Sequence, residues 1–415
     1  MTTRANPKSH SFYYAVGMVF YLVCQWLTTV IVTRMDLTSG GILTLAIAVT
    51  NPFSAIALFT MRAYQVSDID NRFSSRTYVT ARLLTMLFSL ALCVSFTLMN
   101  GYTGVSRACI LLYMGLRLCE ALVDVFQGIE QKTGHLDMVG RSFIARGLAS
   151  TIGFFSVFVA THYLPLALLA MAACSLVVVA VYDIRICRRF VAIKPQFDWR
   201  ALGQLALACL PLTINSFLVS RIGALPSTTL EAAASHEIVG IYGALNAPCI
   251  IVQTAGSFIF NPLIPQFAEK IKNRQKQSLL RQFFKSILII LSITLVCTIG
   301  SWLLGEWGLT LLFGKDVAAY AFLLPQMVLV SGFITLTWFC ALQMIILRYY
   351  AGLLITNFLT LIVTSLACQY LITQGGLLYA PASLAVGIAF QAALYGYFLW
   401  RKYHQIFADK PLSNT

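Results

Sequence analysis

The chain has 415 residues, of which 59% are hydrophobic and 11% charged, and its formal net charge is +14 at pH 7. Ordinary soluble domains are about 45–50% apolar and about 25% charged, so this chain has too few polar side chains to cover a soluble surface. Intrinsic disorder is excluded for the same reason. The composition therefore predicts a polytopic membrane protein.

The hydropathy pattern predicts an all-α fold of about twelve membrane-spanning helices, since a bilayer core of about 30 Å needs about 20 apolar residues per helix. The predicted spans are residues 11–32, 40–61, 78–99, 108–127, 142–162, 164–182, 201–220, 238–259, 286–304, 320–347, 352–372 and 381–400. The basic segment 270–285 is expected to form an amphipathic surface helix that leads into the ninth span.

The positive charges orient these spans. If the N-terminus is cytoplasmic, most of the 29 Lys and Arg residues fall in or beside cytoplasmic connections. Arg34, Arg107, Arg221 and Lys315 fall on the opposite side, and Arg117 lies within a span. Because cationic loops are translocated poorly, this bias predicts that both termini are cytoplasmic. The positive net charge is then explained by cytoplasmic Lys and Arg residues that face anionic lipid headgroups. Membrane lipids, and not nucleic acid, are therefore the expected partner.

The longest cytoplasmic connections follow the sixth and eighth spans. The first of them divides the chain into an N-terminal six-helix lobe (1–183), a cytoplasmic linker (184–200), a C-terminal six-helix lobe (201–402) and a cytoplasmic tail (403–415). The two lobes are predicted to be pseudo-symmetric, because IVTR at 31–34 and LVSR at 218–221 close the first and seventh spans.

An Asn beside a Pro marks the second span of each predicted lobe. Asn51 precedes Pro52, and Asn246 lies two residues before Pro248. Interrupted helices at corresponding places of two repeats are typical of a transporter's substrate site, so both Asn residues are candidate binding residues. The alternative is that both motifs are ordinary helix kinks.

Three ionisable residues share one face of the fourth span, where charge is costly unless it faces a cavity or a partner. They are Arg117, Glu120 and Asp124. Arg117 is a candidate for substrate binding, and Glu120 and Asp124 are candidates for ion coupling. The alternative is a structural Arg–Glu pair. Arg146 of the fifth span is predicted to pair with Glu120 or Asp124 if the two helices are neighbours.

Arg34 and Arg221 are expected at the outer ends of the first and seventh spans. Arginine suits a diphosphate, because its planar fork forms two parallel hydrogen bonds and keeps its charge. Both residues are therefore candidates for binding an anionic substrate, and the alternative is a side chain that snorkels to the interface. On the inner side, Arg62, Arg72 and Arg82 are interpreted as charges that set the topology.

Motifs of enzymes, cofactors and metals are absent from the sequence. The eleven Cys residues form no CxxC pair, and the five His residues are scattered, so no metal site is predicted. The segment GLTLLFGK at 308–315 has five residues between its glycines and an Asp after its Lys, so it is not a phosphate-binding loop. We therefore expect a secondary transporter without a cofactor rather than an enzyme.

Several local motifs resemble the polysaccharide-repeat flippases of the multidrug/oligosaccharidyl-lipid/polysaccharide exporter superfamily, of the O-antigen and capsule type. These motifs are RAYQVSD at 62–68 with Arg82, DVFQGIEQ at 124–131, and LFGK at 312–315. The resemblance extends over the whole chain in span number and in the division into two halves, although some members have 14 spans.

The resemblance implies a V-shaped fold of two six-helix lobes around a central cavity that opens alternately to each side of the bacterial cytoplasmic (inner) membrane. It implies an undecaprenyl-diphosphate-linked oligosaccharide substrate, carried from the inner to the outer leaflet for surface polysaccharides such as the O-antigen of lipopolysaccharide. A proton or sodium ion and polysaccharide polymerase machinery are the further expected partners. Two alternatives stay open: a multidrug exporter of the same superfamily, and a membrane glycan polymerase or ligase.

Overall fold

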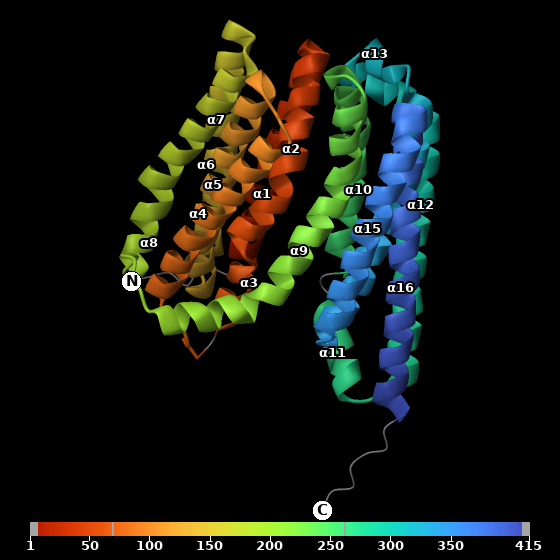
Figure 1. The fold of residues 1–415 in the computed structure, drawn as a ribbon. Coiled ribbons are helices and arrows are strands. Elements are labelled where there is room, and N and C mark those ends of the chain that lie inside the picture. Colours follow the sequence, from red (N-terminus) through yellow and green to blue (C-terminus); the bar gives the residue numbers. More distant parts are fainter. Residues whose placement is uncertain (1–6, 69, 261–262, 409–415) are drawn as a thin grey trace, which may run out of the picture. The chain divides into compact units, whose positions relative to one another are not determined.

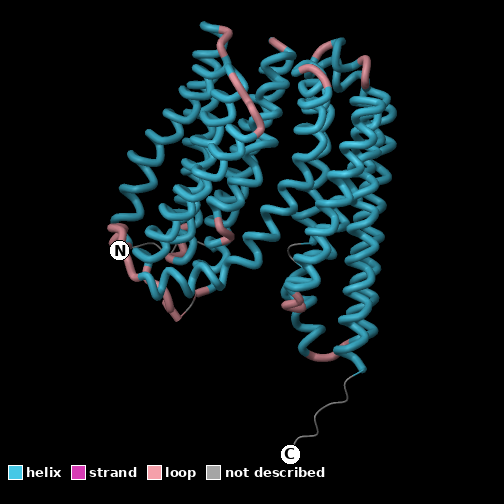
Figure 2. The backbone as a smooth tube through the Cα atoms, viewed as in Figure 1, coloured by secondary structure: helices cyan, strands magenta, loops and turns pink. Residues whose placement is uncertain are grey.

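The computed structural model describes residues 7–68, 70–260 and 263–408, and its regular structure in these ranges is entirely helical (Figure 1, Figure 2). The first half of the chain contains α1 (Pro7–Met35), α2 (Leu37–Leu58), α3 (Met61–Ser67), α4 (Ser75–Met99), α5 (Gly104–Lys132), α6 (Leu136–Thr161), α7 (Leu164–Val178), the π-helix η1 (Val179–Asp183) and α8 (Ile184–Phe190). The second half contains α9 (Trp199–Ala233), α10 (His236–Phe260), α11 (Ile264–Lys272), α12 (Lys276–Phe313), α13 (Lys315–Ala318), α14 (Leu324–Ile346), α15 (Tyr350–Gly375) and α16 (Ala380–Ala408).

The predicted all-α, multi-pass fold is confirmed. Nine helical segments of the described residues are long and apolar enough to cross a membrane, and one of them, Tyr350–Phe407, comprises both α15 and α16. The helices α5 and α10, which coincide with the predicted fourth and eighth spans, have 29 and 25 residues. Each predicted span therefore coincides largely with one long helix, except the sixth (164–182), which α7 and η1 form together.

Two local predictions are wrong. Arg221 does not end a helix, because α9 continues from Trp199 to Ala233, and an arginine has good helix propensity. The segment 270–285 is not one surface helix: α11 ends at Lys272, Arg274 adopts a φ of 53°, and α12 begins at Lys276. Asn273 caps the end of α11, and Arg274 in the left-handed region turns the chain.

The chain packs as two compact units, Met1–Ala224 and Leu225–Thr415. In the first unit, α1 packs along α6, and α5 contacts α2, α4 and α7. In the second unit, α14 contacts α10, α12 and α16, and α15 packs along α16. The lobe boundaries deduced from the loops stay a prediction, and residues 409–415 of the predicted tail lie outside the described residues.

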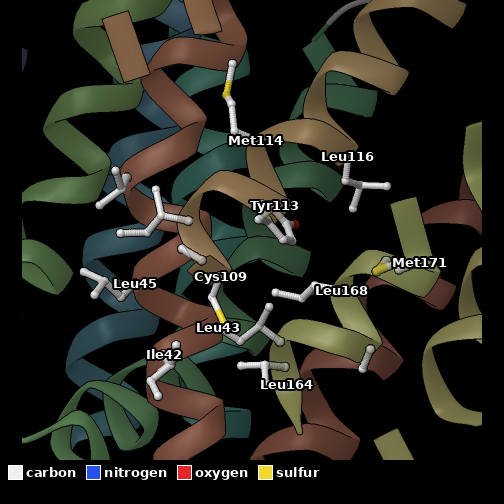
Figure 3. Packing of buried hydrophobic residues seen from close by; sticks show 14 of the residues in the cluster. Ile42, Leu43, Leu45, Cys109, Tyr113, Met114, Leu116, Leu164, Leu168 and Met171 are labelled. Atoms are coloured by element: carbon white, nitrogen blue, oxygen red, sulfur yellow. The ribbon is translucent and has the colours of Figure 1, made fainter. Parts of the chain in front are cut away.

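Apolar side chains fill the space between α2, α5 and α7 (Figure 3). Leu43 and Leu45 of α2, Met114 and Leu116 of α5, and Leu168 of α7 are each no more than 1% exposed. Inside a membrane such contacts stabilise mainly through close van der Waals packing, because lipid tails are as apolar as the side chains. This packing holds the register of α5, which carries the charged residues of the fourth span.

The contact between α1 and α6 depends on two glycines. A Cβ atom on Gly17 would overlap the backbone of Gly140, and one on Gly140 would overlap the backbone carbonyl of Tyr13. Small residues let two helix backbones approach closely, which is a common way to join helices in a membrane. The close approach brings Tyr21 of α1 near Phe143 of α6, with ring centres 5.7 Å apart.

Candidate functional site

A polar cluster surrounds Arg117 and Glu120 in the first unit. Nη1 of Arg117 donates to Oε2 of Glu120 at 2.8 Å, and Nη2 donates to Oδ1 of Asn51 in α2 at 2.8 Å. The hydroxyl of Tyr21 in α1 donates to Oε1 of Glu120 at 2.5 Å. The side chains of Arg117 and Glu120 are 23% and 18% exposed, so the cluster joins three helices without being sealed off.

Asp124, one turn further along α5, has different partners. Nη2 of Arg82 in α4 donates to Oδ2 of Asp124 at 2.6 Å. The side chain of Arg82 is fully buried, and its Nη1 donates to the carbonyl oxygen of Ala57 at 2.6 Å. Arg62 lies 3.7 Å from Oδ1 of Asp124 and donates to the side-chain oxygen of Gln127 at 2.8 Å. The interpretation of Arg82 as a topology charge is therefore wrong, because it is a buried partner of Asp124.

Arg146 makes no ion pair with Glu120 or Asp124 in the described part of the chain, so its predicted pairing is wrong. Its guanidinium carbon lies 5.0 Å from the ring centre of Tyr21 and 5.2 Å from that of Phe143. A guanidinium over an aromatic ring is attracted by the negative face of the ring. Arg146 therefore reaches Glu120 indirectly, through the tyrosine that bonds to it.

The other predicted binding residues lie elsewhere. Arg34 is exposed in the last turn of α1. Arg221, in the interior of α9, lies with its guanidinium carbon 5.6 Å from the ring centre of Phe96 in α4. Asn246 is half-buried in α10, which belongs to the second unit. The structure thus brings together Asn51, Arg117 and Glu120 from the predicted set.

Tyr21 was missed by the sequence analysis, because a single tyrosine in an apolar span gives no sign of its partner. Arg82 did give a signal, since it lies within the predicted span 78–99, where a charge needs a partner. Its contact with Asp124 could have been inferred from this position together with the acidic face of the fourth span.

The loop between α3 and α4, which follows the RAYQVSD motif, is held by Asp68. Its carboxylate accepts hydrogen bonds from the backbone N–H of Arg72 at 2.9 Å and of Phe73 at 3.2 Å, and from the hydroxyl of Tyr78 at 3.2 Å. Burial alone would raise the pKa of Asp68, but these donors and the ammonium of Lys132, 3.8 Å away, lower the pKa below its ordinary value.

A cavity of about 470 Å³ adjoins this loop and lies wholly within the first unit. Gln65, Tyr78, Gln131 and Lys132 are among its lining residues. Both motifs that carry the family resemblance in this half of the chain, 62–68 and 124–131, therefore contribute polar side chains to one cavity.

The described residues contain no group of three or more His, Cys, Asp or Glu side chains that could hold a metal ion. The cysteines are free thiols, and all except Cys119, Cys174 and Cys297 are buried. All except Cys187 lie in apolar runs of the sequence and pack as small apolar side chains, whereas the thiol of Cys187 contacts the carbonyl oxygen of Phe126 and Oε1 of Glu130.

No protein-family model matches the chain. A relative in sequence is the capsular polysaccharide biosynthesis protein CapF of Staphylococcus aureus, which is 24% identical over 307 residues, 73% of this chain and 76% of CapF.

Solved structures with the same fold are much more distant in sequence. The lipid II flippase MurJ in an inward closed conformation gives a TM-score of 0.71 at 9% identity, over 95% of this chain and 90% of MurJ. An inward-facing multidrug resistance MATE family transporter of the MOP superfamily gives 0.69 at 12% identity, over 98% of this chain and 100% of the transporter. The bent form of the MATE transporter VcmN of Vibrio cholerae gives 0.59 at 12% identity, over 97% and 96% of the two chains.

These comparisons confirm the resemblance predicted from the sequence. The chain shares the fold of MATE family transporters and of the lipid II flippase MurJ, and the nine long apolar helical segments of its described residues make it a multi-pass membrane protein. Its relative CapF is named for the biosynthesis of capsular polysaccharide.

Proposed function

We propose that the chain is a flippase that moves an undecaprenyl-diphosphate-linked oligosaccharide repeat unit from the inner to the outer leaflet of the bacterial cytoplasmic membrane. The observation that carries the proposal is the combination of a homologue named for capsular polysaccharide biosynthesis with a fold shared with a lipid II flippase. Transport would proceed by ion-coupled alternating access, with both termini in the cytoplasm.

The diphosphate of the substrate would be held by arginine. Arg117 is the central candidate, because its guanidinium lies on α5 and already makes two charge-assisted or polar bonds, to Glu120 and Asn51. A diphosphate would compete with Glu120 for the same fork and leave the Asn51 bond in place. Arg34, Arg221 and Asn246 are the further proposed contacts along the path of the substrate.

Ion coupling would use the carboxylates of α5. Glu120 is released when a diphosphate takes its place on Arg117, and it can then bind a proton or sodium ion. Asp124 is the second proposed coupling residue, and its bond to the buried Arg82 supports the structural alternative for this residue. The transported repeat units would pass to polysaccharide polymerase machinery on the outer side.

The test uses cells whose surface polysaccharide depends on this chain. Arg117→Ala, Arg34→Ala and Arg221→Ala are expected to reduce surface polysaccharide at least tenfold and to cause lipid-linked repeat units to accumulate. Arg117→Lys tests the need for the planar fork while keeping the charge beside Glu120. The matched control is Arg107→Ala, which removes an exposed arginine at the start of the same helix. Normal polysaccharide from the Arg117 variants, inserted at normal amounts, would contradict the proposal.

Multidrug export is the second candidate, favoured by the fold shared with MATE transporters. Cells that lose drug resistance but keep their polysaccharide when the chain is removed would select this candidate. The proposed substrate-binding arginines, Arg117, Arg34 and Arg221, favour an anionic substrate over a cationic drug.

A further inference from the structure

Two carboxyl groups of the first unit are completely buried and belong to neither cluster described above. They are Glu130 near the end of α5 and Asp183 at the end of η1, and both side chains are 0% exposed. Oε2 of Glu130 and both carboxyl oxygens of Asp183 have no hydrogen-bond partner among the described residues. Oε1 of Glu130 has the thiol of Cys187 at 3.7 Å, which is a weak donor. A buried carboxylate with so few donors is costly as an anion.

The residues around the two carboxyl groups supply little positive charge. The charges of Asp183 and Asp137 oppose ionisation of Glu130, and Tyr182 is coupled to it. The cation that acts on Glu130 is Arg62, which already lies 3.7 Å from Asp124 and donates to Gln127. Asp183 faces Ser142 and Arg146 of α6.

The α6 groups that face Asp183 are themselves short of partners. The hydroxyl of Ser142 is fully buried and acts on Asp183 only as a weak donor, outside the geometry of an ordinary hydrogen bond. Nε of Arg146 has no hydrogen-bond partner in the described ranges. One serine hydroxyl is too little donation for a completely buried carboxylate, which has about four acceptor sites, whereas a bound proton removes the charge itself.

The backbone at Asp183 is unusual in the same place. η1 is a π-helix over Val179–Asp183, and the N–H of Ile184 donates to the carbonyl of Val179. A π-turn inserted between two α-helices is rare and often marks a functional position. Here it sets the direction in which Asp183 leaves the helix, toward α6.

Arg146 connects this pair with the Arg117–Glu120 cluster. Its charge acts on Asp183, and it also acts on Glu120, beside whose partner Tyr21 it is stacked. One guanidinium therefore acts on a carboxyl group of η1 and on a carboxyl group of α5. With Glu130, Asp183 and Glu120 all ionised, and Glu120 shared with Arg117, the Glu130–Asp183 pair keeps an uncompensated negative charge.

We propose that Glu130 and Asp183 form a buried site that binds one proton, and that this site communicates with Glu120 through Arg146. The proton comes from water and returns to water, and only its O–H bond forms and breaks. When the proton leaves, Arg146 is attracted more strongly to Asp183 and less to the Tyr21–Glu120 side. The use of this step in transport rests on the proposed function, whereas the binding of the proton does not.

The test reads the proton directly in the full chain, purified and placed in lipid nanodiscs. Infrared spectroscopy at neutral pH is expected to show the C=O absorption of a protonated carboxyl group, which disappears as the pH is raised. Glu130→Gln and Asp183→Asn, which keep the shape of the side chains, should each remove at least half of this absorption. Glu237→Gln, at an exposed position of α10, is the matched control and should leave it unchanged.

A second measurement needs no variant and covers the case in which a variant fails to fold. Dicyclohexylcarbodiimide reacts with protonated carboxyl groups in apolar surroundings, and peptide mass spectrometry locates the product. Labelling of Glu130 or Asp183 in the wild-type chain, decreasing at alkaline pH, is expected. Absence of the infrared band together with absence of label on both residues would overturn the proposal.

The two proposals fail separately. A titrating carboxyl absorption in a chain that moves no lipid-linked oligosaccharide would leave the proton site standing and end the flippase proposal. Translocation by a wild-type chain whose Glu130 and Asp183 carry no proton at neutral pH would do the reverse.

Discussion

Arg82 shows how a single charge can be kept in the interior of a membrane protein. Its side chain is fully buried, and it bonds to the carboxylate of Asp124 and to the carbonyl of Ala57. These acceptors balance the cost of removing the guanidinium from water, so the intact pair adds little to the stability of the fold. Removal of one partner leaves the other as an uncompensated buried charge and is strongly destabilising.

Asp124→Ala is therefore expected to lower the free energy of unfolding by roughly 3–5 kcal/mol, because it leaves the buried Arg82 without a counter-charge. Arg141→Ala removes half of the i,i+4 pair with Asp137, in which Arg141 is 64% exposed, and should cost less than about 1 kcal/mol. Thermal unfolding of the purified variants in detergent measures both. Equal effects of the two substitutions would show that the fold does not depend on the pairing of Arg82 with Asp124.

Asp68 predicts a dependence of stability on pH. Because its pKa is lower in the folded chain than in the unfolded one, its stabilising contribution is fully present above the unfolded value, about 3.9, and is lost as the pH falls through the lower folded value. Asp68→Asn should unfold at a lower temperature than the wild type at pH 7, and the difference should shrink below about pH 4. A difference that grows on acidification would contradict the hydrogen-bonding scheme of this loop.

At the scale of helices, sequence reasoning succeeded where the signal is local and failed where it is tertiary. Hydropathy located every span, and the i,i+3 spacing of Arg117 and Glu120 allowed for the pair that forms. The sequence could not predict the pairing of Asp124 with Arg82 or the hydrogen bond from Tyr21 to Glu120, because those contacts depend on the rotation of neighbouring helices about their axes. The π-helix before α8 also leaves no trace in the hydropathy of residues 164–190.

The contact of α1 with α6 gives an element-scale prediction. Gly17→Ala places a methyl group against the backbone of Gly140, so the helices must separate, and we expect a loss of about 1–3 kcal/mol. Gly115→Ala, in the middle of α5 with nothing within 4 Å of the added carbon, should be neutral or stabilise by up to about 1 kcal/mol. The same thermal unfolding measurement compares them. A tolerated Gly17→Ala would mean that α1 and α6 are further apart than described.

At the scale of the whole molecule, the distribution of Lys and Arg predicts the orientation in the membrane. Reporter fusions that are active only in the cytoplasm should be active after residue 275 and inactive after residue 316, since the first position lies in a basic connection and the second beside Lys315. The opposite result at both positions would invert the orientation and the direction proposed for transport.

The central claim is that this chain moves a lipid-linked oligosaccharide across a bilayer. The direct measurement places the purified chain in vesicles that contain an undecaprenyl-diphosphate-linked oligosaccharide on one leaflet, imposes a proton gradient, and follows access of an added glycosidase to the sugar. The accessible fraction is expected to rise with the wild-type chain. With Arg117→Ala it should rise at roughly one tenth of that rate or at a lower rate, since loss of a charge-assisted bond is worth about 1.5–3 kcal/mol. An accessible fraction equal to that of protein-free vesicles would contradict the account.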